Sequence, residues 1–374
     1  MDLSLTDEQQ ALLASARSWL DTNYCAPGAF GSLEEEIAWG RQWQARMAAD
    51  GWVGLDWPVG VGGRGLGPVE VALFNMAYAR TGAPQPVNRV GLSHAGPTLL
   101  AHGTADQQRQ WLPRILTAEE IWCQLFSEPE AGSDLTALAT RATQVDDGWL
   151  VNGQKVWTSY AEQARWGMCL ARTGDVPGHR GISFLVLDMT APGVTIRPLL
   201  QITGQAEFSE VFLDDVHVPA SALVGEVNGG WKVAGTTLAY ERGVNFPIKE
   251  QVVHEVHLAR LLEQAEAAGL FDDLLVAEDL AEAYVRLRLL AWANLRTITR
   301  LERGEQPGAE SSWIKLQWSQ LTQQLAHVAV DAFGEDPDWR GQYLWSRAAS
   351  VAGGTSEIQR TIIGERILGL PRGT

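Results

Sequence analysis

The hydrophobic periodicity of this 374-residue chain changes twice, and that change limits the folds open to it. Apolar residues recur at helical spacing up to about residue 120 and again from about residue 229. Between these parts, short runs rich in β-branched and aromatic residues alternate with turn signals, which is typical of strands. We therefore expect an α+β fold with three domains: an N-terminal all-helical domain (1–120), a middle β domain (121–225) and a C-terminal helical domain (226–374).

The first helix is predicted from a capping box. Thr6 precedes an apolar-periodic segment, Gln9 stands at its third position, and Asp7 and Glu8 occupy the first turn, where the helix dipole favours acidic residues. The same spacing predicts further helices in this domain over residues 32–49, 69–81, 91–102 and 106–117.

The middle part predicts about seven or eight strands, enough for a compact barrel or sandwich. Asp146-Asp147-Gly148 and Asn152-Gly153 are read as turns between them. The runs interpreted as strands are 121–126, 138–145, 149–151, 156–158, 165–172, 182–189, 194–199 and 210–218.

After Gly229-Gly230 the chain is predicted to be helical to its end. Two long helical patterns, 252–268 and 276–301, are separated by Gly269 and Asp272-Asp273. Further helices are expected over 308–332 and 356–368.

Charge and composition exclude several classes of partner and of compartment. The net charge is −16 and no Lys/Arg-rich run is present, so nucleic acid and anionic membranes are poor partners. Cys25, Cys123 and Cys169 are odd in number and widely spaced, which fits neither a disulfide framework nor a metal knuckle. The N-terminus lacks the features of a signal peptide, and no apolar run is long enough to span a membrane. We expect a cytoplasmic protein.

Two apparent motifs do not have the context that their usual functions need. Gly60 to Gly65 reads G-x-G-x-x-G, but Trp57-Pro58 precedes it and Pro68 follows, so a surface loop is favoured over a dinucleotide site. His254 and His257 lie three residues apart, and no third ligand is near in the sequence, so we expect no metal.

The segments 124–135 and 153–159 combine hydroxyl groups with a large aromatic side chain. A polar loop between two β-like runs carries Ser127 and Ser133, and the later segment carries Trp157. Hydroxyls, loop amides and an aromatic plane suit a flat, hydrogen-bonding cofactor. A β-turn followed by a core tryptophan is the alternative interpretation of the same residues.

These segments, together with 231–242, 354–360, 364–371 and the His102 to Pro113 region, resemble the acyl-CoA dehydrogenase family. The resemblance extends over essentially the whole chain. It implies an N-terminal helical domain, a middle β domain and a C-terminal four-helix bundle. It also implies FAD between the β domain and the C-terminal helices, and homotetramers built on those helices.

The resemblance implies a role for individual residues. Family members remove a Cα proton from an acyl-CoA thioester and transfer the Cβ hydrogen as hydride to flavin N5. By position, Trp157 would stack over the flavin, Ser127 would contact its pyrimidine edge, and Ser159 would bond near N5. The remaining residues implied are Ser133 near the flavin and the thioester, Thr355 and Glu357 at FAD, and Arg242 at the substrate.

The position of the catalytic base departs from the commonest pattern of the family. That pattern has a glutamate just before Gly-Thr-Ser, whereas this chain has Gly353. The segment Leu238 to Arg242 matches the alternative pattern, in which a glutamate on an early C-terminal helix is the base. The resemblance thus implies that Glu241 is the base; without it, Glu241 and Arg242 would be interpreted as an exposed helical charge pair.

A second departure concerns the oligomer. The family's two cross-subunit FAD segments are absent here, where the chain reads Glu263 to Gly269 and Val330 to Pro337. Similar members, in bacterial steroid side-chain degradation, combine two different subunits in an α2β2 tetramer. A homo-oligomer that binds FAD through other residues remains the alternative.

The resemblance implies an FAD-dependent α,β-dehydrogenase of a bulky, branched or steroid-derived acyl-CoA, with an electron-transfer flavoprotein as acceptor. Three alternatives stay open at this point. The same fold could dehydrogenate acyl groups bound to a carrier protein, could act as a flavin monooxygenase, or could be a non-catalytic subunit of a heteromeric enzyme.

Overall fold

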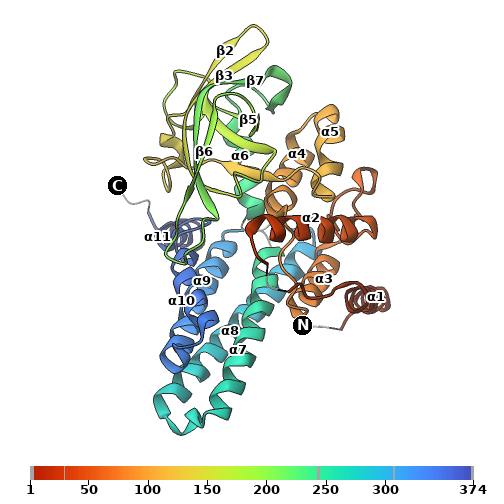
Figure 1. The fold of residues 1–374 in the computed structure, drawn as a ribbon, viewed down its shortest axis with the longest axis vertical. Helices are drawn as coiled ribbons and strands as arrows, with labels where there is room; N and C mark the ends of the chain where they lie inside the picture. The colour runs from red at the N-terminus through yellow and green to blue at the C-terminus, as the bar shows by residue number, and fades with distance from the viewer. Residues whose placement is uncertain (1–3, 29, 242–244, 306–307, 372–374) are drawn as a thin grey trace. The chain divides into compact units, whose positions relative to one another are not determined.

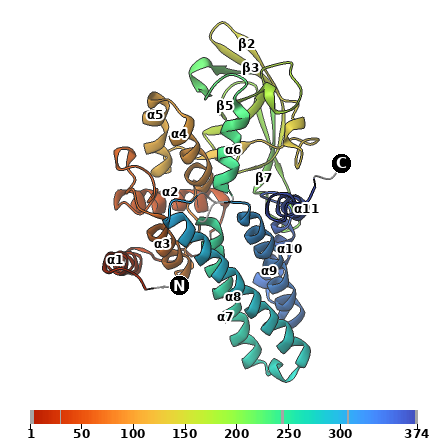
Figure 2. The same cartoon turned by 180° about the vertical axis from the view of Figure 1, so that it is seen from behind.

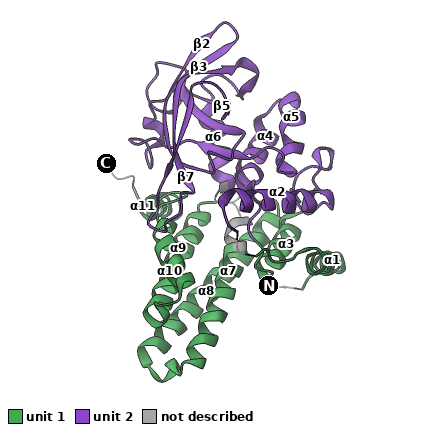
Figure 3. Cartoon of the chain, viewed as in Figure 1, with its two compact units in different colours: residues 1–28, 66–83, 242–374 green, residues 29–65, 84–241 purple. Residues whose placement is uncertain are grey.

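The order of elements in the computed structural model is helical, then β, then helical (Figure 1). The structure describes residues 4–28, 30–241, 245–305 and 308–371. Contacts divide the chain into two units (Figure 3). The first unit comprises residues 1–28, 66–83 and 242–374, and the second comprises residues 29–65 and 84–241.

The predicted capping box is confirmed at the first helix. Gln9 N donates to Thr6 Oγ1 at 3.2 Å, and Thr6 N donates to Gln9 Oε1 at 3.1 Å. The helix predicted over 91–102 begins with a π-helical turn, Gly91–Ala95, before its α-helical part. The α-helices that precede the sheet are α1 (Asp7–Asn23), α2 (Leu33–Ala49), α3 (Pro68–Arg80), α4 (Gly96–His102) and α5 (Ala105–Leu116).

The glycine-rich segment after Trp57 is a largely exposed loop with one 3₁₀ turn, Val59–Val61. The loop is anchored because Trp57 itself is buried. A Cβ on Gly63 would lie 2.2 Å from the Trp57 carbonyl oxygen, and one on Gly96 would lie 2.0 Å from the Trp57 indole. Only glycine allows this close approach at both positions.

The strands of the middle part form one hydrogen-bonded sheet in the order β6-β7-β3-β2-β4-β5-β8, with β1 paired to β4. The pairs β1–β4 and β2–β4 are parallel, and the others are antiparallel. The strands are β1 (Trp122–Leu125), β2 (Arg141–Val145), β3 (Gly148–Ser159), β4 (Trp166–Arg172), β5 (Ile182–Asp188), β6 (Val194–Leu199), β7 (Phe208–Pro219) and β8 (Leu223–Val224).

The predicted turn at Asn152-Gly153 is wrong, because β3 runs through it without a break. The register shifts there since β7 carries an extra residue, and Asp215 adopts a positive φ of 47°. The side chain of Asn152 stabilises the bulge, because its Oδ1 accepts a hydrogen bond from the backbone Asp215 N at 2.9 Å. A Cβ on Gly153 would lie 2.3 Å from Thr140 Oγ1. Asn-Gly thus accommodates a β-bulge and a close contact rather than a hairpin.

The C-terminal helices α7 to α10 pack as the expected four-helix bundle, which is seen from both sides in Figures 1 and 2. Leu258, Leu287, Trp318 and Trp339 belong to its core. The break between the first two helices is confirmed, with Gly269 left-handed (φ 69°). None of the described helices is long and apolar enough to cross a membrane. The helices of this part are α6 (Gly230–Glu241), α7 (Asn245–Ala267), α8 (Leu274–Glu302), α9 (Glu310–Phe333), α10 (Pro337–Ala349) and α11 (Ser356–Ile362).

Candidate active site

Trp157 stands in a second β-bulge of β3. Lys155 pairs with Val211 and Thr158 pairs with Ser209, so β3 has one residue more than β7 between these pairs. Trp157 adopts a φ of 60°, which is rare for a bulky residue and costs about 1–3 kcal/mol. Its side chain is 62% exposed, and its ring meets Phe208 edge to face at a centroid distance of 6.1 Å. The strained backbone thus presents an indole face to solvent instead of burying it.

Ser127 and Ser159 lie close to Trp157 through the backbone. Val156 N donates to Ser127 O at 3.0 Å, which joins the loop after β1 to the residue before Trp157. Ser159 pairs with Phe208, whose ring contacts Trp157. Both serines are partly exposed. The structure therefore places the backbone of two of the three predicted serines close to Trp157, whereas Ser133 lies further along the same loop, exposed to solvent.

Glu241 is the last residue of α6, and α6 is firmly attached within the second unit. Thr237 Oγ1 lies 2.8 Å from Thr98 Oγ1, and Thr236 Oγ1 lies 2.7 Å from His102 Nε2. The first residue of α6, Gly230, touches β5 so closely that a Cβ there would lie 2.4 Å from the Ser183 carbonyl carbon. Arg242, predicted to contact the substrate, lies outside the described residues.

Thr355 and Glu357 belong to the first unit, at the start of α11. Thr355 is the N-cap of this helix, where its Oγ1 accepts from Ile358 N at 3.3 Å. Glu357 is exposed and pairs with Arg360 at 3.5 Å. Hydrogen bonds from the helix N-terminus hold the pKa of Glu357 below its usual value. The position where the common family glutamate would stand, Gly353, is left-handed (φ 66°).

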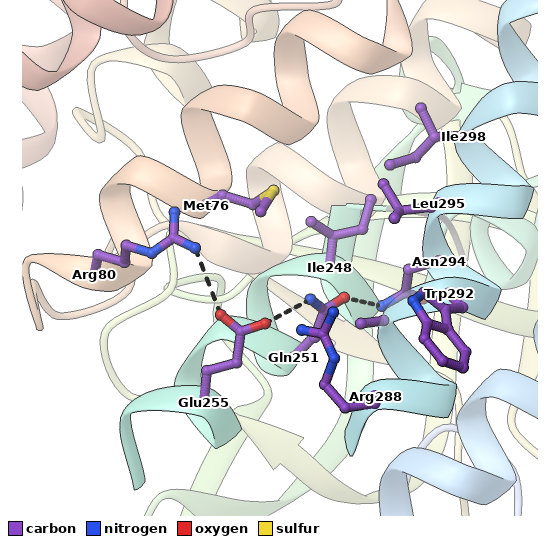
Figure 4. Close-up of a pocket in the computed structure, with 11 residues that line it drawn as sticks. Met76, Arg80, Ile248, Gln251, Glu255, Arg288, Trp292, Asn294, Leu295 and Ile298 are labelled. Atoms are coloured by element: carbon purple, nitrogen blue, oxygen red, sulfur yellow. Dashed lines mark hydrogen bonds and ion pairs between the residues drawn. The ribbon is translucent and has the colours of Figure 1, made fainter. Parts of the chain in front are cut away.

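A pocket of about 270 Å³ lies in the first unit among α3, α7 and α8 (Figure 4). Glu255 accepts from Arg80 at 3.5 Å and from Gln251 at 2.9 Å, and Asn294 donates to Gln251 at 2.9 Å. None of the described residues that were predicted for the active site lines this pocket. Sequence reasoning missed it because its walls come from segments more than 170 residues apart, as Arg80 and Glu255 are (|i−j| = 175).

Comparison with known proteins supports the interpretation of this fold. Family models of the acyl-CoA dehydrogenase N-terminal, middle and C-terminal domains match residues 6–119, 123–216 and 228–368 in order. The chain belongs to the acyl-CoA dehydrogenase family, whose members are FAD-dependent oxidoreductases that act on a CH–CH group.

Curated relatives and solved structures show which kinds of family member the chain is similar to. The chain is 42% identical to the acyl-CoA dehydrogenase IpdE1 of Mycobacterium tuberculosis, over 96% of this chain and 97% of that protein. It is similar to the Tcur3481-Tcur3483 steroid acyl-CoA dehydrogenase (26% identity, TM-score 0.85, all of both chains covered). It is also similar to the ChsE4-ChsE5 complex of M. tuberculosis (30% identity, TM-score 0.85, all of both chains covered). The predicted resemblance to steroid-type members is confirmed.

Proposed function

We propose that this chain catalyses the FAD-dependent α,β-dehydrogenation of an acyl-CoA thioester with a bulky, branched or steroid-derived acyl group. The observation that carries this proposal is the exposed indole of Trp157, at a positive φ beside Ser127 and Ser159, in a fold of this family. The names of the similar structures support the substrate class, since one of them is a steroid acyl-CoA dehydrogenase.

The residues at the end of β3 fit a flavin. An exposed aromatic plane suits stacking against a flat ring system, and neighbouring hydroxyls suit its polar edge. Trp157 would stack on the isoalloxazine, Ser127 would bind its pyrimidine edge and Ser159 would bind near N5. Ser133, Thr355 and Glu357 would complete the cofactor site. When bound, FAD would supply the acceptor for the hydride that leaves Cβ.

Glu241 would remove the α-proton of the thioester. A carboxylate becomes an effective base when a dry site raises its pKa towards the working pH. The attachment of α6 at Thr236, Thr237 and Gly230 supports this role, because a base must be held at a fixed position relative to the Cα–H bond. Arg242 would bind the substrate, and an electron-transfer flavoprotein would accept the electrons.

We also infer that the active assembly contains a second, different subunit. The two segments through which the common family reaches FAD across subunits are absent from this chain, at 263–269 and 330–337. The names of both similar structures mention two components, Tcur3481-Tcur3483 and ChsE4-ChsE5. A partner subunit would supply the missing cofactor contacts.

Anaerobic flavin bleaching with a panel of acyl-CoAs tests the proposed reaction. Bulky or steroid-derived acyl-CoAs should bleach the wild-type flavin, and Glu241→Gln should slow bleaching by about 10²–10⁴-fold while FAD stays bound. Glu226→Gln, in the exposed segment before α6, is the matched control and should bleach at the wild-type rate.

Three results would contradict the proposal. Bleaching of Glu241→Gln at the wild-type rate would show that the base is another residue. Bleaching only by carrier-protein thioesters would change the substrate class. Rapid oxygen consumption by the reduced enzyme would indicate a flavin monooxygenase.

A further inference from the structure

Two charged side chains, Lys155 and Glu128, are buried close to Trp157, which follows Lys155 by two residues in β3. Lys155 is 0% exposed and Glu128 is 7% exposed, and Lys155 Nζ lies 2.7 Å from Glu128 Oε1. Burial alone would raise the pKa of Glu128, but the Lys155 ammonium and the surrounding hydrogen bonds hold that pKa below its usual value. The Glu128 carboxyl is therefore ionised at neutral pH inside the protein.

The hydrogen bonds of this pair connect four segments of the second unit. Lys155 Nζ donates to Phe126 O at 3.1 Å, to Leu170 O at 2.8 Å and to Glu128 Oε1 at 2.7 Å. All three N–H donors of the ammonium are therefore used. Glu128 also accepts from Ala139 N at 2.6 Å and from Thr140 N at 3.0 Å. The pair thus fixes β3 against β4 and against the loop that begins with Ser127.

The position of Lys155 decides which way Trp157 points. In a regular strand, residues 155 and 157 would face the same side, and residue 158 would face the other. Here Lys155 and Thr158 are both buried and Trp157 is exposed, because the bulge inserts one residue between them. If β3 slipped by one residue at this point, the indole would turn inward. An ammonium held by three acceptors prevents that slip.

The stability of the fold alone does not account for this pair. Buried ion pairs can often be replaced by apolar side chains of similar volume without loss of stability, because taking two charges out of water offsets most of their attraction. What an apolar pair cannot reproduce is the directional attachment to the carbonyls of Phe126 and Leu170.

We propose that Lys155 and Glu128 are positioning residues, which hold the Trp157 bulge and the Ser127 loop in the geometry that binds the flavin. The inference rests on the proposed function for the identity of the ligand. Its structural part, the fixed bulge, can be measured without any cofactor.

The test compares Lys155→Met, the double variant Lys155→Met/Glu128→Gln and the control Arg141→Met. Arg141 pairs with Asp175 at 2.6 Å on the exposed surface of the same sheet, so its loss should change nothing that is measured. The double variant leaves no unpaired buried charge, but the carbonyls of Phe126 and Leu170 lose a donor, so it should still unfold cooperatively, at a somewhat lower denaturant concentration than the wild type. Two readouts are then compared: FAD dissociation, with the shape of the flavin absorption band, and amide hydrogen exchange of the peptide that contains Val156.

In the double variant we expect FAD to bind at least about tenfold more weakly, with an altered absorption band, and the Val156 amide to exchange at least about tenfold faster. Wild-type FAD affinity and wild-type exchange in a folded double variant would overturn the inference. Loss of folding in both Lys155 variants would overturn it too, since the pair would then serve the fold itself. If the wild type binds no FAD even in complex with its partner subunit, the proposed function fails, and hydrogen exchange alone still decides whether the pair fixes the bulge.

Discussion

At the scale of single residues, His254 makes the stability of the C-terminal bundle depend on pH. The imidazole is buried and stacks on the Trp318 ring, with the two ring centroids 6.4 Å apart. Its Nε2 lies 3.0 Å from Thr322 Oγ1. Burial, with a smaller contribution from His257, lowers the pKa of His254 to about 3. The folded state therefore keeps His254 neutral at pH values where the unfolded chain takes up a proton.

The sign of the effect follows from this difference in proton binding. The contribution of His254 is fully present above about pH 6.5, the pKa in the unfolded chain, and is lost as the pH falls towards about 3. We expect the free energy of unfolding to fall by up to about 1.4 kcal/mol per pH unit in this range. Urea unfolding at several pH values measures the slope. His254→Gln should reduce it, and an unchanged slope in that variant would assign the effect to other groups.

Lys315 is a second buried lysine that donates to backbone carbonyls. Its Nζ donates to Ala349 O at 3.0 Å and to Gly354 O at 2.8 Å, in the turn before Thr355. Lys315→Met would leave these carbonyls with fewer donors, so we expect a loss of about 1–3 kcal/mol in the free energy of unfolding, together with weaker FAD binding. Lys232→Met removes an exposed lysine and serves as control in denaturant titrations. Equal stability of the two variants would argue against this role.

At the scale of elements, the packing of α6 against β5 can be tested directly. Gly230 touches the backbone of Ser183 and Phe184, whereas Gly235, in the same helix, has no atom within 4 Å of an added Cβ. Gly230→Ala should force α6 away from the sheet and cost about 1–3 kcal/mol. Gly235→Ala should stabilise the helix by about 0.5–1 kcal/mol.

The two glycine variants also separate stability from catalysis. Because Glu241 ends α6, displacement of the helix in Gly230→Ala should slow flavin bleaching more than it weakens FAD binding. Thermal unfolding and anaerobic stopped-flow measurements on both variants check this. If the flavin bleached at the same rate in Gly230→Ala and in Gly235→Ala, the packing of α6 against β5 would not position the base.

The elements themselves were largely predictable from the sequence. A capping box, helical periodicity and Gly269 predicted the long helices to within a few residues, except that α7 begins at Asn245, seven residues before the predicted start. Helix α10 was missed, although Asp336 and Pro337 form a usable start signal. Strand β3 was divided wrongly, because an Asn-Gly pair that accommodates a bulge on the neighbouring strand has the same local sequence as a hairpin turn.

At the scale of the whole molecule, the composition of the assembly is the main expectation. We expect the chain, purified from its own host, to come with a second subunit of the same family in equal amount, with FAD bound. Produced alone, it should bind less than one FAD per chain. Light scattering, mass spectrometry and flavin absorbance measure these quantities. A homo-oligomer of this chain alone, with one FAD per chain, would contradict the expectation.

The sequence by itself determined the class of fold and the residues to consider. Periodicity and caps depend on neighbours a few positions apart, and the family motifs name Trp157, Ser159 and Glu241 directly. The tertiary structure alone decided how Trp157 is presented. Its outward indole depends on a bulge that is fixed by an ion pair between Lys155 and Glu128, which lie 27 residues apart. No local pattern encodes that contact, since a buried lysine is stable only when distant segments supply its acceptors.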